Sequence, residues 1–246
     1  MLINFFGIKI LTDPVLFPRI GIRLPGLTIG PKRLTAPALE FRELPTIDVI
    51  LLSHAHFDHF DLRTLNRFDQ STSVITASNT RDLLRWTSLR DITELRWDER
   101  TTIKTAAGDI SISALRVKHW GARKQRDTYR GYNGYLLERN GERILFAGDT
   151  ALTNTFTELR ECAPLDLAIM SIGAYNPWVR SHCTPEQAIE MANAAGAQFI
   201  IPVHHQTFRL SFEPFREPIE RFENALRTEP GRIALREIGE TFVLPL

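Results

Sequence analysis

Three imidazoles and one carboxylate occur within six residues of this sequence, where His54, His56, Asp58 and His59 follow the apolar run 49–52. Imidazole nitrogens and carboxylate oxygens are usual protein ligands of zinc. If residues 54–56 are extended, His54 and His56 point the same way, because side chains repeat every two residues along a strand. If the chain then turns into a helix, Asp58 and His59 face a neighbouring point, and two adjacent metal positions result. The competing interpretation is a group of polar residues in an exposed loop.

One cluster cannot complete two metal sites, so further ligands must come from elsewhere in the chain. Asp149, His119 and His204 each follow an expected strand. A carboxylate that follows a glycine at a strand end can bridge two cations with its two oxygens. A site built on one rim of a sheet predicts such an arrangement. Taken alone, Asp149 could cap a helix or turn, and either histidine could be structural.

The elements that position these side chains are visible as strands and helices along the chain. Apolar runs that end in turn residues predict strands at residues 8–11, 49–52, 74–76, 102–105, 110–117, 135–138, 144–147, 167–171, 199–203 and 241–244. Residues 1–11 resemble two strands joined by a Gly turn rather than a signal peptide. Helices are predicted at 62–68, 79–88, 185–195 and 217–228, and residues 17–44 are predicted to form a long ordered loop. Many strands with intervening helices favour an α/β or α+β sandwich.

Composition limits the classes of partner. The 246 residues, 43% of them hydrophobic, fit one large globular domain or two small ones. A net charge of +1 gives no general reason to expect nucleic acid, and no run of 18 apolar residues predicts a membrane span. Cys162 and Cys183 do not form a CxxC pair, which favours a reducing, cytoplasmic location.

The His-x-His-x-Asp-His motif, together with Ile172-Gly173-Ala174-Tyr175 and His182-x-x-Pro185-Glu186, resembles the metallo-β-lactamase fold superfamily. More narrowly, the sequence resembles the branch that contains N-acyl-phosphatidylethanolamine-hydrolysing phospholipase D. Further matching segments are 11–15, 30–33, 43–48, 53–61, 148–150 and 204–208, so the resemblance spans nearly the whole chain. It implies one domain over residues 1–246, folded as a four-layer αβ/βα sandwich with a dimetal site at the edge of the two sheets. Members of the branch begin with an additional strand before the segment that matches residues 2–3.

The resemblance also implies a ligand set. Carried over residue by residue, one metal is bound by His54, His56 and His119, the other by Asp58, His59 and His204, and Asp149 bridges them. His205 occupies a position where the branch often has Trp, so His204 is the preferred ligand of this doublet. His182 is the candidate electrophile or general acid, with a loop histidine as the alternative. The expected cofactor is a pair of zinc ions, and manganese and iron are the alternatives.

The expected chemistry is hydrolysis. A metal-bridging water has its pKa lowered from about 15.7 to near 7, which supplies hydroxide at neutral pH. Asp58 can orient that hydroxide, which attacks phosphorus or a carbonyl carbon. Six cations between Arg116 and Arg130 would suit a phosphate-bearing substrate, or they form a solvated loop. Residues 208–215 could form an apolar wall for an acyl chain, or they pack in the core.

Four functions remain open from the sequence. The first is a phosphodiesterase acting on a phospholipid or a smaller phosphate diester. The second is a lactonase or other carboxylic-ester hydrolase, for example on a sugar-phosphate lactone. An RNA-processing nuclease is disfavoured by the near-neutral charge, and a non-catalytic scaffold by the presence of a residue at every expected ligand position. The expected partner is therefore a small-molecule or lipid substrate, without nucleic acid.

Overall fold

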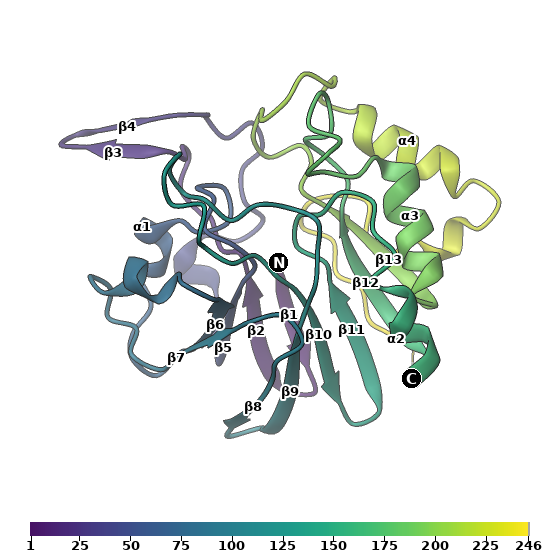
Figure 1. Ribbon diagram of the computed structural model, residues 1–246, viewed down its shortest axis with the longest axis horizontal. Coiled ribbons are helices and arrows are strands. Elements are labelled where there is room, and N and C mark those ends of the chain that lie inside the picture. The colour runs from purple at the N-terminus through teal and green to yellow at the C-terminus, as the bar shows by residue number, and fades with distance from the viewer. Residues whose placement is uncertain (246) are drawn as a thin grey trace.

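The computed structural model describes residues 1–245, and its framework is a pair of β-sheets that pack against each other (Figure 1). The first sheet has the spatial order β1-β2-β5-β6-β7, with β1 (Leu2–Phe5), β2 (Ile8–Thr12), β5 (Val49–Leu52), β6 (Ser73–Ala77) and β7 (Ile92–Leu95). β1 is antiparallel to β2, whereas β2, β5, β6 and β7 run parallel to one another.

The second sheet has the order β13-β12-β11-β10-β9-β8. Its strands are β8 (Arg100–Thr105), β9 (Gly108–Leu115), β10 (Gly134–Arg139), β11 (Glu142–Phe146), β12 (Leu165–Ser171) and β13 (Ala197–Val203). β8 to β11 form an antiparallel meander, and β11, β12 and β13 are parallel. The loops after β11, β12 and β13 therefore leave the sheet at the same edge.

Helices cover the outer faces of the two sheets. α2 (Thr157–Cys162), α3 (Pro185–Ala194) and α4 (Glu217–Ala225) lie outside the second sheet (Figure 1). α1 (Leu62–Leu65) and the 3-10 turn η2 (Arg81–Leu84) lie outside the first, and the short turns η1 (Phe41–Glu43) and η3 (Pro230–Arg232) complete the helical elements of residues 1–245. This is the predicted four-layer αβ/βα sandwich. Among the same residues, no helix is both long enough and apolar enough to span a lipid bilayer.

The period-2 pattern of the strands explains the layers. In β5, Val49 and Leu51 join the cluster between the two sheets, while Ile50 and Leu52 join the cluster under α1. All four side chains are fully buried. A strand covered on both faces is a continuous apolar run, and each fully buried aliphatic side chain contributes roughly 1.5–3 kcal/mol. A third cluster fills the space between the second sheet and α2, α3 and α4.

Several predicted elements differ from those observed. Residues 79–88 form only the short turn η2, because the Glu94 carboxylate accepts the backbone N–H groups of Thr80 and Arg81 and Asn79 is left-handed. Residues 241–244 are not a strand, since no strand of the described chain pairs with them and Val243 is 80% exposed. The predicted loop 17–44 contains a hairpin, β3 (Ile22–Leu24) and β4 (Leu27–Ile29). α2 and β7 were not predicted.

Candidate metal centre

The histidine cluster lies in the loop between β5 and α1. His54 is extended and forms an isolated β-bridge with Tyr132. The chain then turns, since the backbone N–H groups of His59 and Phe60 both donate to the carbonyl of His56. His54 and His56 face one position, and this turn places Asp58 and His59 beside it, as the spacing predicts.

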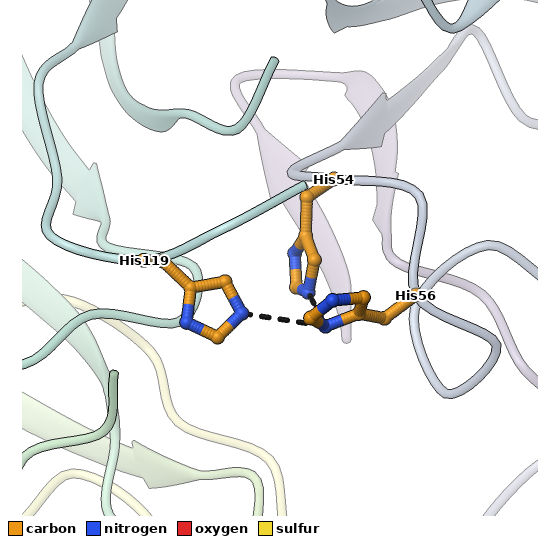
Figure 2. Close-up of side chains that lie close together, drawn as sticks. All are labelled: His54, His56 and His119. Atoms are coloured by element: carbon orange, nitrogen blue, oxygen red, sulfur yellow. Dashed lines mark hydrogen bonds between the residues drawn. The ribbon is translucent and has the colours of Figure 1, made fainter. Parts of the chain in front are cut away.

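A first group of potential ligands consists of His54, His56 and His119. Figure 2 shows their imidazoles pointing toward one another, with His119 arriving from the loop after β9. Nδ1 of His56 lies 2.8 Å from Nε2 of His54 and 3.3 Å from Nε2 of His119. Three ring nitrogens from two distant segments therefore meet at one point.

A second group consists of Asp58, His59 and His204. Oδ2 of Asp58 lies 3.4 Å from Nε2 of His59 and 3.2 Å from Nε2 of His204. The His59 and His204 rings stack, with centroids 4.9 Å apart. His204 follows β13 directly, so the end of the second sheet brings this side chain to a loop of the first.

Asp149 lies between the two groups, three residues after β11. Its Oδ2 is 3.1 Å from Nε2 of His59, 3.3 Å from Nε2 of His204 and 4.0 Å from Nε2 of His119. The other oxygen, Oδ1, accepts the Ser171 hydroxyl at 2.8 Å. Asp149 thus has one oxygen held by the protein and one turned to imidazoles of both groups.

His182 belongs to the same cluster. Its Nδ1 lies 3.7 Å from Oδ2 of Asp149, and its ring stacks on His204 at 5.6 Å. The structure therefore brings together all eight residues that the sequence singled out. Their roles as ligands or catalyst remain predictions.

The two rings of the doublet His204-His205 lie in different surroundings, and the geometry favours His204 as the candidate ligand. His204 has φ of +61°, a left-handed conformation that costs a residue other than glycine about 1–3 kcal/mol. This backbone turns the imidazole of His204 toward Asp58. Gly173 permits the arrangement, because a Cβ there would lie 2.2 Å from the carbonyl oxygen of His204. His205 is absent from every group of potential ligands among residues 1–245 and lines the neighbouring cavity instead.

Hydrogen bonds hold the far nitrogens of three imidazoles and leave the near ones facing the cluster. Nδ1 of His119 donates to the carbonyl of Ser181 at 2.8 Å, Nδ1 of His59 donates to Asp13 at 2.7 Å, and Nδ1 of His54 lies 2.9 Å from the Ser53 hydroxyl. Metal-bound histidines usually have such a partner on the other nitrogen. Nε2 of His59 is buried, faces the cluster and has no hydrogen-bond partner within the described chain, so this nitrogen fits a metal ion.

Electrostatics agree with a site for cations. Burial lowers the pKa of His56 to about 4 and that of His119 to about 3, so both imidazoles are neutral at pH 7, the form that can bind a metal ion. Burial acts to raise the pKa of Asp149, but the charges of His204 and His59 outweigh it, and this pKa lies well below its ordinary value. For His59 burial acts to lower the pKa, yet the neighbouring carboxylates, chiefly Asp149, raise it well above the ordinary value.

Asp13 is a site residue to which the sequence assigned no role. Its carboxylate accepts the Ser53 backbone N–H at 2.8 Å, the Ser53 hydroxyl at 2.5 Å and Nδ1 of His59 at 2.7 Å. It therefore orients His59 directly and His54 through Ser53. Two signals in the sequence pointed to Asp13, its position just after a predicted strand and its place in the matching segment 11–15.

The Asp13→Asn variant is expected to bind metal about 10–100-fold more weakly, the usual effect of removing a group that orients ligands. The amide keeps the volume but cannot accept all three hydrogen bonds. Chelator competition with a metallochromic indicator measures the affinity. Asp166→Asn is the matched control, since Asp166 also accepts a backbone N–H, from Arg143 at 2.6 Å, but belongs to none of the groups of potential ligands. Equal affinities of the two variants would contradict the role of Asp13.

Three of the six cations between Arg116 and Arg130 serve the fold. Arg116 pairs with Asp98, and Arg130 pairs with Asp82 and Asp127. Arg123 donates to the carbonyls of Ala55 at 2.9 Å and Phe60 at 2.8 Å, and burial lowers its pKa to about 10. Arg123 thus ties the histidine loop to the loop that carries His119, and Lys118, Lys124 and Arg126 remain exposed.

Thr150, Tyr175 and Cys183 lie in the motifs around the site, and their side chains make contacts that stabilise the fold. The Thr150 hydroxyl accepts the backbone N–H of Lys118 at 2.9 Å and so connects the strand end of Asp149 to His119. The Tyr175 hydroxyl donates to Glu217 on α4 at 2.6 Å. Burial raises the pKa of the Cys183 thiol to about 12, which makes it a packing residue rather than a nucleophile.

A sequence profile of the Beta-lactamase superfamily domain matches residues 9–205, a span that contains all of these side chains. The chain belongs to this superfamily. Solved structures with a similar fold agree with the sandwich described above. An isothiocyanate hydrolase from Delia radicum gut bacteria has a TM-score of 0.73 at 16% identity and covers 98% of this chain and 95% of its own. Igni18, a metallo hydrolase from Ignicoccus hospitalis, has a TM-score of 0.71 at 18% identity, covering 97% and 91%.

Two of the relatives of this superfamily member are longer than this chain. The mitochondrial N-acyl-phosphatidylethanolamine-hydrolyzing phospholipase D of Saccharomyces cerevisiae is 34% identical over 227 residues, 88% of this chain and 48% of that protein. A Mycobacterium tuberculosis protein is 29% identical over 97% of this chain and 65% of its own length. A metal-dependent hydrolase of Methanoculleus marisnigri is 24% identical, covering 79% and 80%. The chain thus spans about half to two thirds of the first two.

Proposed function

We propose that this protein is a dimetal hydrolase of phosphate diesters, a phospholipid or a smaller diester, and that residues 1–246 act as one domain. The observation that carries the proposal is the meeting of two ligand groups at the Oδ2 atom of Asp149. We assign His54, His56 and His119 to one zinc ion, Asp58, His59 and His204 to the other, and Asp149 to both.

The phosphodiester is favoured by the 34% identical yeast relative, whose name describes cleavage of a phospholipid diester. The cavity beside the site agrees with a lipid substrate. It has a volume of about 530 Å³, has His204 in its wall, and is bordered by Phe208, Leu210 and Phe212. This supports the apolar wall predicted at residues 208–215. We also propose a cytoplasmic location, which the two free cysteines favour.

Two divalent ions at this site would lower the pKa of water toward 7 and offset charge that develops on substrate oxygens. Asp58, whose Oδ2 lies 3.4 Å from Nε2 of His59 and 3.2 Å from Nε2 of His204, would orient the attacking water by accepting a hydrogen bond from it. His182 would donate a hydrogen bond from its imidazole to a substrate oxygen, since its Nδ1 is buried and has no hydrogen-bond partner within residues 1–245. Asp13, Ser53 and Ser171 would keep the ligands in place without touching substrate.

Removal of metal is expected to abolish hydrolysis, and zinc is expected to restore it. Elemental analysis of the purified protein identifies the bound metal first. The chelator-treated protein is then reloaded with zinc, manganese or iron and assayed with chromogenic phosphodiesters and lactones. Phosphodiester cleavage that needs metal supports the proposal. Full activity without metal would rule it out, and cleavage of lactones alone would establish the lactonase alternative.

A further inference from the structure

The hairpin β3–β4, here called the arm, projects from the body of the molecule (Figure 1). In its register Ile22 is paired with Ile29 and Leu24 with Leu27. Residues paired in this way lie on the same face of a two-stranded sheet. The four side chains are 60%, 54%, 45% and 57% exposed, respectively, so one face of the arm is apolar and open to solvent.

The arm is a built structure and not a frayed loop. Its base is anchored by the buried Ile20 and by Arg63 of α1, which donates to the Thr28 hydroxyl at 3.1 Å. Gly21 and Gly30 cross at this base, where a Cβ on Gly21 would lie 2.1 Å from the carbonyl oxygen of Ile29. The sequence therefore maintains an ordered element whose apolar face has no cover in the described chain, and such faces mark interaction sites.

The charged side chains of the segment that carries the arm have a single sign. Residues 14–39 contain Arg19, Arg23, Lys32 and Arg33 and no acidic residue. None of the four forms an ion pair with any described residue, and Arg23 and Lys32 are exposed. An anionic surface complements this charge. A second copy docked arm to arm would bring cations together, which is unfavourable.

The arm is continuous with the mouth of the cavity beside the metal centre. Arg33 forms a β-bridge with Phe208, the backbone N–H of Leu34 donates to Thr207 at 2.8 Å, and the Thr35 hydroxyl donates to Gln206 at 2.7 Å. Leu34, Phe212 and Phe215 line that cavity and are 54%, 72% and 46% exposed. Exposed apolar residues therefore extend from the tip of the arm to a cavity that includes His204.

We propose that the arm and this rim dock the protein on a bilayer of anionic phospholipid. The apolar face of the arm enters the boundary between headgroups and acyl chains, as amphipathic surface elements do. Arg23 and Lys32 lie at the level of the lipid phosphates. The mouth of the cavity then faces the bilayer, so that a lipid reaches the metal centre without crossing water. The role of docking in bringing lipid to the metal centre rests on the proposed function. Docking itself requires no hydrolysis.

Sedimentation of the metal-loaded full chain with vesicles tests the proposal. Binding is expected to phosphatidylcholine vesicles that contain phosphatidylglycerol, not to phosphatidylcholine alone, and to weaken in high salt. The double variant Leu24→Ser/Leu27→Ser is expected to bind about ten-fold or more weakly, and Arg23→Gln about five-fold. Val243→Ser changes an exposed apolar residue outside the arm and is expected to bind like the unaltered protein.

The outcomes separate docking from catalysis. Cleavage of a water-soluble phosphodiester is expected to be unchanged in the arm variants. If the unaltered protein binds anionic vesicles but cleaves no phosphodiester, only the proposed function is refuted. Absence of binding to anionic vesicles, or equal binding by the double variant, overturns docking. Light scattering measures the molar mass of the unaltered protein and of the double variant. If the unaltered protein is a dimer that binds no vesicles and the double variant is a monomer, the arm contacts a second copy of the chain instead.

Discussion

The Asp149→Ala variant is expected to lose both metal ions and all measurable hydrolysis. Oδ2 of Asp149 lies within 4.0 Å of ring nitrogens of His59, His119, His182 and His204, so its removal affects both ligand groups together. Loss of a residue that only orients a ligand weakens metal binding about 10–100-fold, and loss of a shared ligand should exceed this. Metal content by elemental analysis, measured beside phosphodiesterase activity, checks the prediction.

A matched control separates this effect from a general loss of charge. Asp109→Ala removes an exposed carboxylate from β9 and is expected to retain metal and activity. Far-ultraviolet circular dichroism of both variants tests whether the fold is kept. Because β11 and β12 are paired by backbone hydrogen bonds next to Asp149, we expect most of the secondary structure to remain. A fully metallated and active Asp149→Ala protein would contradict the bridging role.

The His204→Ala and His205→Ala variants are expected to differ sharply. His204→Ala should lose the metal held with Asp58 and His59 and retain the other, because the group of His54, His56 and His119 does not include the removed ring. Activity should fall by more than about 100-fold, since a water positioned by both ions would lose one of them.

His205→Ala should keep both ions. Burial lowers the pKa of His205 to about 4, and its side chain borders the cavity rather than the ligand groups. Its removal is therefore expected to change the Michaelis constant for a lipid substrate more than metal content. Titration of each apo-variant with zinc gives the stoichiometry. The reverse pattern, with His205→Ala losing an ion, would reassign the ligand.

Local patterns were sufficient for most of the scaffold. The strands β2, β5, β6 and β8 to β13 lie where apolar runs predicted them, and α3 begins at Pro185, as predicted for the helix at 185–195. Failures occurred where a distant residue decided the outcome. Glu94 shortens the helix expected at 79–88, and residues 241–244 have strand composition but no neighbouring strand. A strand forms only if a partner is available for its backbone groups.

The arm illustrates the same limit. Residues 17–44 have no clear periodicity, and the hairpin within them depends on its turn and on anchoring by Arg63 from α1. That the four apolar side chains share one exposed face follows from the pairing of Ile22 with Ile29, which composition does not reveal.

The sequence by itself determined the kind of chemistry. The types of the potential ligands and their two-residue spacing are local properties, and both can be read from the segment that contains His54, His56, Asp58 and His59. Only the tertiary structure decided how the remote residues reach the site and which groups orient them. Thr12 is paired with Leu51 in the parallel register of β2 and β5, and this register brings Asp13 to Ser53 and His59, 40 and 46 positions away. Similarly, the left-handed backbone of His204 turns its imidazole toward Asp58. Both outcomes depend on contacts between distant segments, which exist only once the sheets have packed.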